Sequence, residues 1–545
     1  MTHILAIQYR RQQLNNCRLF KLFESRQLIV LIRIITLGMV LILSACSDNS
    51  EPQLKPLEST SALSQPIRFA LVSAPVTLSP LYATDATSVR INRLLYQRLV
   101  DFAVDGHPIP SLASWQRISL RHYRFTLKLD EYAQLPRFHH NKELTAQDVK
   151  ASYQAVLDKK TASPHRKSLA HIEYMDVLDK RTIDFYLSRD DALFPAFLVI
   201  GIMPKDLLKA HHPFNTQPVG SGDFVFSQWP FEGQLFLRRR SDKQLFEFLK
   251  VKDPSLRVLK LLRGEVDIVQ NNLPPEHIQF LQKRAEDKTS PLVFLTKKGA
   301  NYSYLGFNLQ DKDTGSLLVR QAIAYALDRD KIIRYALGNA AQKAEGFFPE
   351  YHWLGSALMH YEFKQKKAIA LMHQLGYSEK KHLSLTYKTS SDPFRIRIAS
   401  IIQSQLKAVF IDVDIRSYDW GTFYGDIKKG HFQMYSLTWV GINTPDIFRY
   451  VFHSDSIPPT GANRGRLLNA SIDQLIEQAE QEQDMTHYVQ NYQHLQKKIQ
   501  QLLPYVSLWY EDNIAFLRRD IIGYEVSANG NYDTLRFVAR QTAKH

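Results

Sequence analysis

The chain has 545 residues, 44% of them hydrophobic and 23% charged, an ordinary balance for a globular protein with several domains or one multi-lobed unit. Its formal net charge is +15, but no basic run interleaved with aromatic residues predicts a recognition helix, which argues against a nucleic-acid partner. Both cysteines, Cys17 and Cys46, lie in the first tenth of the sequence, so the remainder contains no disulfide and no thiolate chemistry.

Residues 1–45 have the pattern of a signal peptide. Basic residues come first, and the apolar run 34–43 has the length of a signal-peptide core and is short for a membrane span. The sequence Leu43-Ser44-Ala45-Cys46 resembles the bacterial lipobox, which implies that Cys46 is lipidated and becomes the mature N-terminus. An N-terminal transmembrane anchor is the alternative, and either would hold the protein at a membrane. Residues 46–65 are polar, with Pro and Ser, and predict a flexible tether.

The next part of the chain predicts strands, turns and one helix with a clear start. A strand and a proline turn are expected over residues 67–80, a helix over 92–100, and a strand with one buried face over 123–129. Thr145 and Asp148 have the spacing of a capping box, in which the side chain of each residue accepts a hydrogen bond from the other's backbone. A helix is therefore expected directly after Thr145.

Beyond residue 300, helical and strand patterns alternate. A buried strand is expected over residues 304–309, and an amphipathic helix over 319–327, where apolar residues recur at three- and four-residue spacing. Further helices are expected over 366–375, 395–408 and from 472 to near Pro504, and further strands over 383–387, 411–415 and 433–439. This alternation predicts α/β lobes.

Four stretches carry a more specific signal. They are residues 144–149 (LTAQDV), 218–224 (PVGSGDF), 256–269 (LRVLKLLRGEVDIV) and 301–334, which contains LGFNL and VRQAIAYALDRDKI. Together they resemble the peptide/nickel-type solute-binding proteins of ABC importers, solute-binding family 5. The resemblance covers roughly residues 66–540. It implies an α/β fold, a bilobed clamshell like other periplasmic binding proteins, with an extra subdomain in the first lobe (the cluster C type).

The same resemblance implies how the chain is divided. Residues 66–295 would form lobe I, with an inserted subdomain at about 100–217, and residues 296–509 would form lobe II. Residues 510–545 would return to complete lobe I.

The resemblance also implies a function without catalysis or cofactor. A lipid-anchored monomer on the periplasmic side of a bacterial membrane, inner or outer, would capture a peptide or peptide-like solute and deliver it to an ABC permease. A nickel-chelate or other non-peptide binder, a cell-envelope enzyme and a ligand-sensing lipoprotein are the alternatives. The sequence contains no H-E-x-x-H, C-x-x-C, Walker A or G-x-G-x-x-G motif, which favours binding over enzymology.

The residues that anchor short peptides in relatives are not reproduced here. In peptide-binding relatives, a strand ending in W-x-x-D supplies an aspartate for the ligand's α-amino group. Here the strand ends at Trp439, and Ile442 occupies the aspartate position. The arginine that holds the ligand carboxylate in dipeptide-binding relatives corresponds to Thr389, with Lys388 beside it.

Replacement groups are expected around the same strand end. Asp446 could pair with an amine, or could cap a helix beginning at residue 447. Residues 463–466 (NRGR) offer cations. Aromatic side chains could form flat apolar walls of a ligand pocket, or could be plain core. The candidate ligand-binding residues are Tyr304, Tyr418, Trp420, Trp439, Ile442, Asn443 and Asp446. No metal site is expected.

Overall fold

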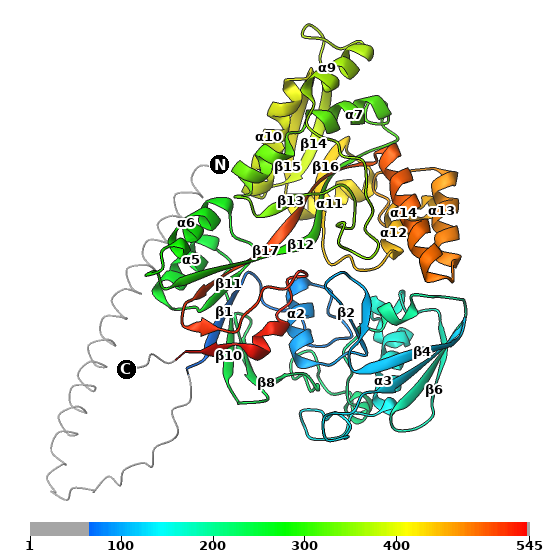
Figure 1. The fold of residues 1–545 in the computed structure, drawn as a ribbon, viewed down its shortest axis with the longest axis vertical. Coiled ribbons are helices and arrows are strands. Elements are labelled where there is room, and N and C mark those ends of the chain that lie inside the picture. Colours follow the sequence, from blue (N-terminus) through cyan, green and yellow to red (C-terminus); the bar gives the residue numbers. More distant parts are fainter. Residues whose placement is uncertain (1–64, 542–545) are drawn as a thin grey trace, which may run out of the picture. The chain divides into compact units, whose positions relative to one another are not determined.

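The computed structural model describes residues 65–541, so the signal peptide, Cys46 and nearly all of the expected tether lie outside the described residues. Its main feature is a mixed sheet of 11 strands (Figure 1). In order across the sheet the strands are β15 (Ile411–Tyr418), β14 (Leu383–Ser390), β16 (Met434–Trp439), β12 (Leu292–Phe307), β17 (Tyr505–Arg518), β11 (Ile268–Gln270), β1 (Ile67–Leu71), β10 (Leu245–Lys250), β9 (Gln234–Arg239) and β8 (Phe224–Phe231), with β13 (Ala341–Lys343) paired to β17.

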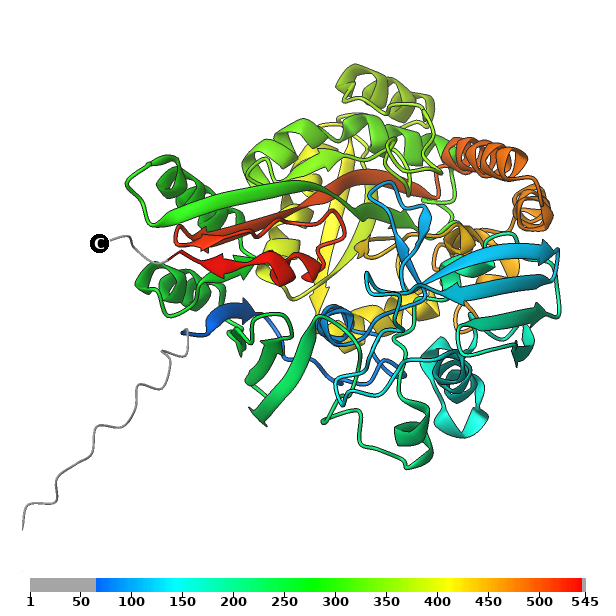
Figure 2. The same ribbon diagram turned by 60° about the horizontal axis from the view of Figure 1, so that its bottom comes forward.

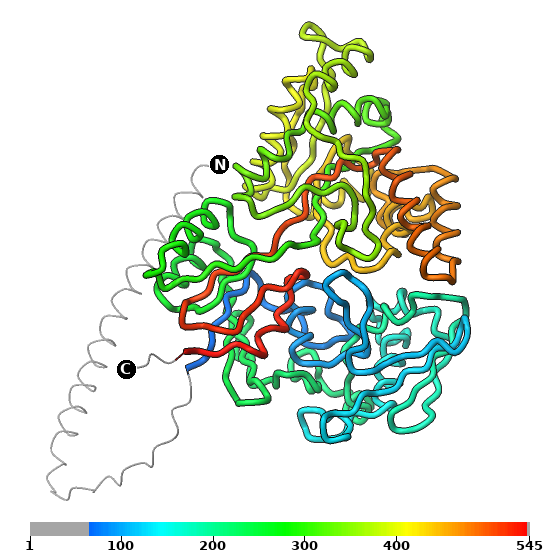
Figure 3. Tube along the Cα trace, viewed as in Figure 1, coloured from blue at the N-terminus to red at the C-terminus, as the bar shows by residue number. Residues whose placement is uncertain are grey.

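Two long strands join the two halves of this sheet. β12 and β17 pair antiparallel along most of their length and lie side by side in both ribbon views (Figures 1 and 2). We use lobe I for the half from β11 to β8 and lobe II for the half from β15 to β16, each with its covering helices. The chain passes from lobe I into lobe II through β12 and returns through β17, as the colours of the tube show (Figure 3). β12 is much longer than the short strand that the sequence predicts.

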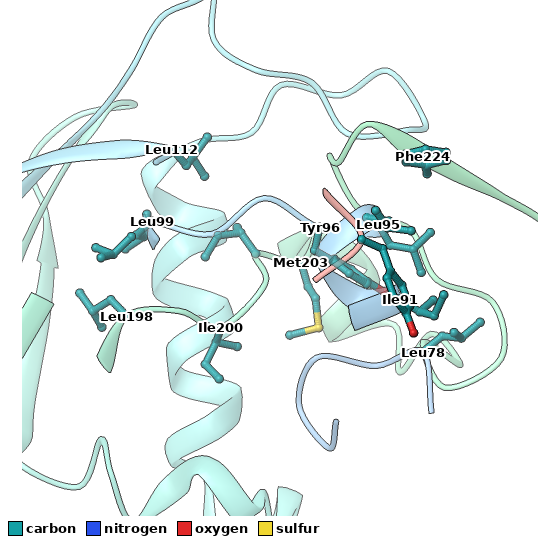
Figure 4. Packing of buried hydrophobic residues seen from close by; sticks show 14 of the residues in the cluster. Leu78, Ile91, Leu95, Tyr96, Leu99, Leu112, Leu198, Ile200, Met203 and Phe224 are labelled. Atoms are coloured by element: carbon teal, nitrogen blue, oxygen red, sulfur yellow. The ribbon is translucent and has the colours of Figure 1, made fainter. Parts of the chain in front are cut away.

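The core of lobe I surrounds helix α2 (Ala86–Leu95), whose buried Ile91 and Leu95 pack among other apolar side chains (Figure 4). The Asp85 side chain caps this helix by accepting a hydrogen bond from the backbone of Ser88 at 2.9 Å. The expected helix over residues 92–100 is wrong beyond Leu95. The chain instead extends into β2 (Val100–Phe102), which pairs with β3 (Pro108–Pro110), because these backbone groups find strand partners.

The end of α2 is held by the glycine turn at residues 218–224. The Gly222 N–H donates a hydrogen bond of 2.9 Å to the Leu95 carbonyl. A Cβ atom on Gly220 would lie 2.0 Å from the Leu95 carbonyl oxygen, and one on Gly222 would lie 2.3 Å from that of Leu94. Both positions therefore require glycine because the turn approaches the helix end closely.

A separate four-stranded sheet lies between α2 and β8 in the sequence, and we count it with lobe I. Its strands, in order, are β4 (Ala113–Ser119), β5 (His122–Leu127), β7 (Thr182–Leu187) and β6 (Ile172–Val177), and helix α3 (Ala146–Leu157) packs against it. The expected helix start is confirmed, since the Asp148 carboxylate accepts hydrogen bonds of 2.8 Å from both the backbone N–H and the hydroxyl of Thr145.

Another helix of lobe I, which the sequence analysis does not predict, has a defined start and end. α5 (Pro254–Arg263) begins after Asp253, which accepts a hydrogen bond of 2.7 Å from Leu256, and ends at Gly264 in the left-handed region. The remaining helices of this lobe are α4 (Lys205–Lys209) and α6 (Pro275–Glu286).

Lobe II is a sheet covered by helices on both faces. Because side chains alternate along β12, Leu305 packs in one core and Tyr304 in the other. The first face is covered by α7 (Leu317–Ala326), α9 (Gln365–Gln374) and α10 (Pro393–Lys407). The second is covered by α11 (Trp420–Lys429), α12 (Asp446–Phe452), α13 (Ala470–Gln481) and α14 (Met485–Leu502). Within residues 65–541, no helix is long and apolar enough to cross a membrane.

Candidate functional site

Two adjoining cavities lie where lobe I meets the loop that follows β16. Their volumes are about 470 Å³ and 510 Å³. The residues that line both are Arg93, Tyr96, Arg98, Phe102, Gly441, Asn443 and Asn529. We call the two cavities together the interlobe cleft. Cavities of this size accommodate small solutes, and their polar side chains can fix the orientation of a ligand.

The lobe II wall of the cleft contains the loop of residues 440–443, together with Tyr351 and His352. Gly441 has a φ of +71°, a backbone conformation that favours glycine and turns the chain sharply at this point. Ile442 and Asn443 line the cleft, and Ile442 also packs against the core of lobe II. This loop therefore presents an aliphatic side chain and an amide, but no carboxylate, to a solute.

The lobe I wall carries a network of opposite charges. The Arg93 guanidinium donates hydrogen bonds to Asp533 (3.1 Å from Nε) and to Asp101 (3.0 Å from Nη2). Arg98 Nη2 donates to the same Asp101 carboxylate at 2.7 Å. Burial alone would raise the pKa of Asp101, but the charges of Arg98 and Arg93 outweigh it and lower the pKa to about 2.

Trp439 and Tyr304 meet around a buried cation, Arg464, which is only 7% exposed. Arg464 donates hydrogen bonds to the hydroxyls of Tyr304 at 3.2 Å and Tyr424 at 3.0 Å, and its guanidinium lies 4.6 Å from the centre of the Trp439 ring. Tyr304 is itself fully buried and stacks on Tyr505 with ring centres 4.0 Å apart. Tyr304 thus supports the strand end from within the core of lobe II.

Tyr418 and Trp420 lie apart from the residues that line the interlobe cleft. Trp420 is the first residue of α11, is 59% exposed, and stacks on Tyr424 with ring centres 5.4 Å apart. Lys388 lies over the Tyr418 ring and forms an ion pair of 2.6 Å with Asp426. The positive charge that accompanies Thr389 in the sequence is therefore already paired within lobe II.

Asp446 lies in a different cavity, of about 660 Å³, between α12, α14 and residues 189–197 of lobe I. It is the first residue of α12, but Pro445 holds the N-cap position, so Asp446 does not cap this helix. It accepts a hydrogen bond from the Thr444 hydroxyl. Although Asp446 remains exposed to solvent, crowding by protein desolvates its carboxylate and raises its pKa, and the charges of Asp191 and Glu480 raise the pKa further.

The charged network on lobe I was not among the residues singled out from the sequence. Asp533 and Arg93 are 440 positions apart, so no local pattern connects them. The only local signal is the three-residue spacing of Arg98 and Asp101. Among the described residues, no group of three or more histidine, cysteine or acidic side chains is arranged to hold a metal ion.

Comparisons with known proteins agree with this architecture. The family model described as bacterial extracellular solute-binding proteins, family 5 Middle, matches residues 107–457. The dipeptide-binding protein of Escherichia coli (strain K12) is 25% identical over 518 residues, which cover 87% of this chain and 94% of that protein. Heme-binding protein A of Haemophilus influenzae is 26% identical over 537 residues, covering 90% of this chain and 96% of that protein.

A solved structure gives the same picture. The periplasmic binding protein DppA from Helicobacter pylori in complex with the peptide STSA superposes with a TM-score of 0.69 at 26% identity, covering 87% of this chain and 98% of that one. The expected bilobed α/β fold is thereby confirmed, and the relatives are solute-binding proteins rather than enzymes. The chain belongs to the family 5 extracellular solute-binding proteins of bacteria.

Proposed function

We propose that the chain captures a peptide or peptide-like solute in the interlobe cleft and delivers it to an ABC permease. The observation that carries the proposal is the position of the cleft between the lobes. Helix α2 and the residues that follow it line the cleft from lobe I, and the loop after β16 lines it from lobe II. A dipeptide-binding protein and a peptide complex among the relatives support a peptide as the solute class.

Closure of the two lobes would bury the solute. β12 and β17 are the long segments shared by both lobes, and Lys297 and Asn301 of β12 line the cleft. The lobes also touch where the backbone N–H of Trp353 donates a hydrogen bond of 2.9 Å to the Asp105 carbonyl. Hinge closure about such connections is a common way for binding proteins to enclose a ligand.

The proposal includes the location of the protein. Lipidation of Cys46 would anchor a monomer on the periplasmic side of the inner or outer membrane, with residues 46–65 as a tether. The divisions at 66–295, 296–509 and 510–545 remain part of this proposal. Signalling without transport is the competing role, and a permease gene beside this one would favour import.

A non-peptide solute is the second candidate. Ile442 removes the carboxylate that would pair with a peptide amine, and one relative is a heme-binding protein. A nickel chelate belongs to the same class of alternatives, with the metal as part of the solute rather than as a resident cofactor.

Native mass spectrometry of the full-length protein, purified from its host, separates these possibilities. A co-purified molecule that fragments as a peptide or acylated peptide supports the proposal. A porphyrin or a metal chelate would overturn the peptide assignment and favour the second candidate.

A further inference from the structure

One side chain in the interlobe cleft has unused hydrogen-bonding capacity. Arg98 lies between α2 and β2, lines both cavities, and has a side chain that is only 11% exposed. Its Nη2 atom is engaged with Asp101, but its Nε and Nη1 atoms have no hydrogen-bond partner among the described residues. Buried donors of a charged group that lack partners are costly, so a ligand acceptor at this place would be strongly favoured.

The surroundings leave Arg98 only partly neutralised. Its one carboxylate partner, Asp101, is shared with Arg93. Desolvation and the neighbouring Arg93 charge both lower the pKa of Arg98, which means that the site disfavours its positive charge. A negative group placed against Nε and Nη1 would offset both effects.

Other charges around the cleft favour an anion over a cation. Arg90 lines the cavity of about 510 Å³, lies over the Tyr532 ring, and forms no ion pair with another described residue. Arg464 behind the lobe II wall likewise has no carboxylate partner within residues 65–541. Of the carboxylates that line the cleft, Asp223 is 3.6 Å from Arg536, and Asp101 and Asp533 are bound to Arg93. The fourth, Glu525, is exposed to solvent and forms no ion pair with another described residue.

Neighbouring polar atoms suit a peptide-like acid. The Gln97 Oε1 atom lies in the same wall and also lacks a partner among the described residues. It can accept a hydrogen bond from an amide N–H of the solute while Arg98 donates to a carboxylate.

We propose that Arg98 is the specificity-determining residue of the solute site, where Nε and Nη1 donate hydrogen bonds to a carboxylate of the solute. The chain would then select peptide-like acids whose amine is blocked or absent. This inference rests on the proposed function of the interlobe cleft. It places the carboxylate anchor on lobe I, far in sequence from Thr389.

The test compares two probes that differ in one charge. N-acetyl-Ala-Ala-Ala with a free carboxylate and the same peptide as its C-terminal amide are titrated calorimetrically into the full-length protein. The acid should bind about 10- to 100-fold more tightly, the range expected for hydrogen bonds to a charged group. Arg98→Gln should remove this preference and leave the affinity for the amide within a few fold.

Two further variants separate binding from folding. Arg98→Lys keeps the charge and should retain part of the acid preference, which a purely structural role does not predict. Arg416→Gln, an exposed arginine on β15, should behave as wild type. Melting of each ligand-free variant reports whether the fold is intact.

The outcomes distinguish this inference from the proposed function. If the wild type binds both peptides and Arg98→Gln keeps the acid preference, Arg98 is not the anchor, although peptide binding stands. If the wild type binds neither peptide, the peptide proposal fails. Native mass spectrometry then tests whether Arg98 anchors a carboxylate of the co-purified solute. A co-purified acid that is lost from Arg98→Gln supports the anchor, and equal retention of that molecule overturns it.

Discussion

The Arg464 guanidinium packs against the Trp439 ring at 4.6 Å and places a buried positive charge directly behind the end of β16. The resemblance to peptide-binding relatives implies an aspartate for the ligand amine just beyond this strand end, whereas Ile442 occupies that position here. An ammonium group at this wall would lose its hydration, find no carboxylate in the loop, and lie near a cation. We therefore expect the lobe II wall to disfavour a free amine.

The first prediction concerns this amine selectivity. Unmodified di- and tripeptides should bind weakly, and Ile442→Asp should gain affinity for them, because a desolvated ammonium and carboxylate pair is worth a few kcal/mol, on the order of 2. Calorimetry with Ala-Ala and with N-acetyl-Ala-Ala measures the change. Ile442→Asn is the matched control, since it has nearly the same shape without the charge. An equal gain in the asparagine variant would show that charge is not the cause.

Asp446 allows a separate check of the same question. If Asp446 had taken over the amine, Asp446→Asn should weaken the binding of Ala-Ala. Its position in the other cavity, beside α14, leads us to expect no change. If the wild type binds Ala-Ala tightly and Asp446→Asn does not, the solute site is the cavity that contains Asp446.

The second prediction concerns the anchor. Cys46→Ala should release the protein from membranes or leave an unprocessed precursor, because the lipidated residue of the lipobox-like sequence is lost. Fractionation and intact mass of the N-terminus measure both outcomes. Cys17→Ala changes the other cysteine and should leave fractionation as in wild type. Absence of lipid on wild-type Cys46 would contradict the prediction.

The third prediction concerns closure. A solute that binds only the folded chain should raise the free energy of unfolding, by roughly 2.7 kcal/mol at a hundredfold excess over Kd. Small-angle scattering should show a smaller radius of gyration as the lobes close. The co-purified molecule, added back to stripped protein, is the ligand for both measurements. Binding that changes neither melting nor scattering would contradict closure.

The fourth prediction concerns Asp101 and pH. Its pKa is lowered to about 2, so its ion pairs stabilise the fold above its ordinary pKa of 3.8, and this stability is lost as pH falls through about 2. Asp101→Asn should lower stability at pH 7 by about 2 kcal/mol, the amount that corresponds to this shift. The difference from wild type should shrink below pH 4, as measured by denaturant midpoints between pH 7 and pH 2.5.

A control isolates this effect from the titration of other acids. Asp414→Asn removes an exposed carboxylate on β15 and should change stability little at any pH. A deficit of Asp101→Asn that stays constant from pH 7 to pH 2.5 would show that the lost stability is not due to ionisation.

The sequence predicted those features that local chemistry determines. The Thr145 and Asp148 spacing marked the start of α3, and apolar periodicity marked α7 and α10. The end of α2 was misjudged, because the groups that stop it come from Gly222, far along the chain. Local signals cannot report a stop that tertiary contacts impose.

The candidate site was less accessible to the same reasoning. The sequence alone identified the cleft residues of the loop after β16, because the motif that ends at Ile442 is contiguous in the chain. Arg93 and Asp533 meet only through folding, since α2 and residues 525–536 come from opposite ends of the described chain. Aromatic composition alone could not separate Tyr304, which is core, from exposed Trp420.

The glycine turn at residues 218–224 has a consequence for how the cleft can adapt to different solutes. The turn donates a hydrogen bond to the Leu95 carbonyl and packs closely against the end of α2. It thereby holds in place the helix that carries Arg93 and the following segment that carries Arg98. That wall is thus preorganised, and little conformational entropy is lost there when a solute docks. We expect tolerance for solutes of different shape to come from the opposite side, where Gly441, with a φ of +71°, gives the loop of residues 440–443 more backbone freedom.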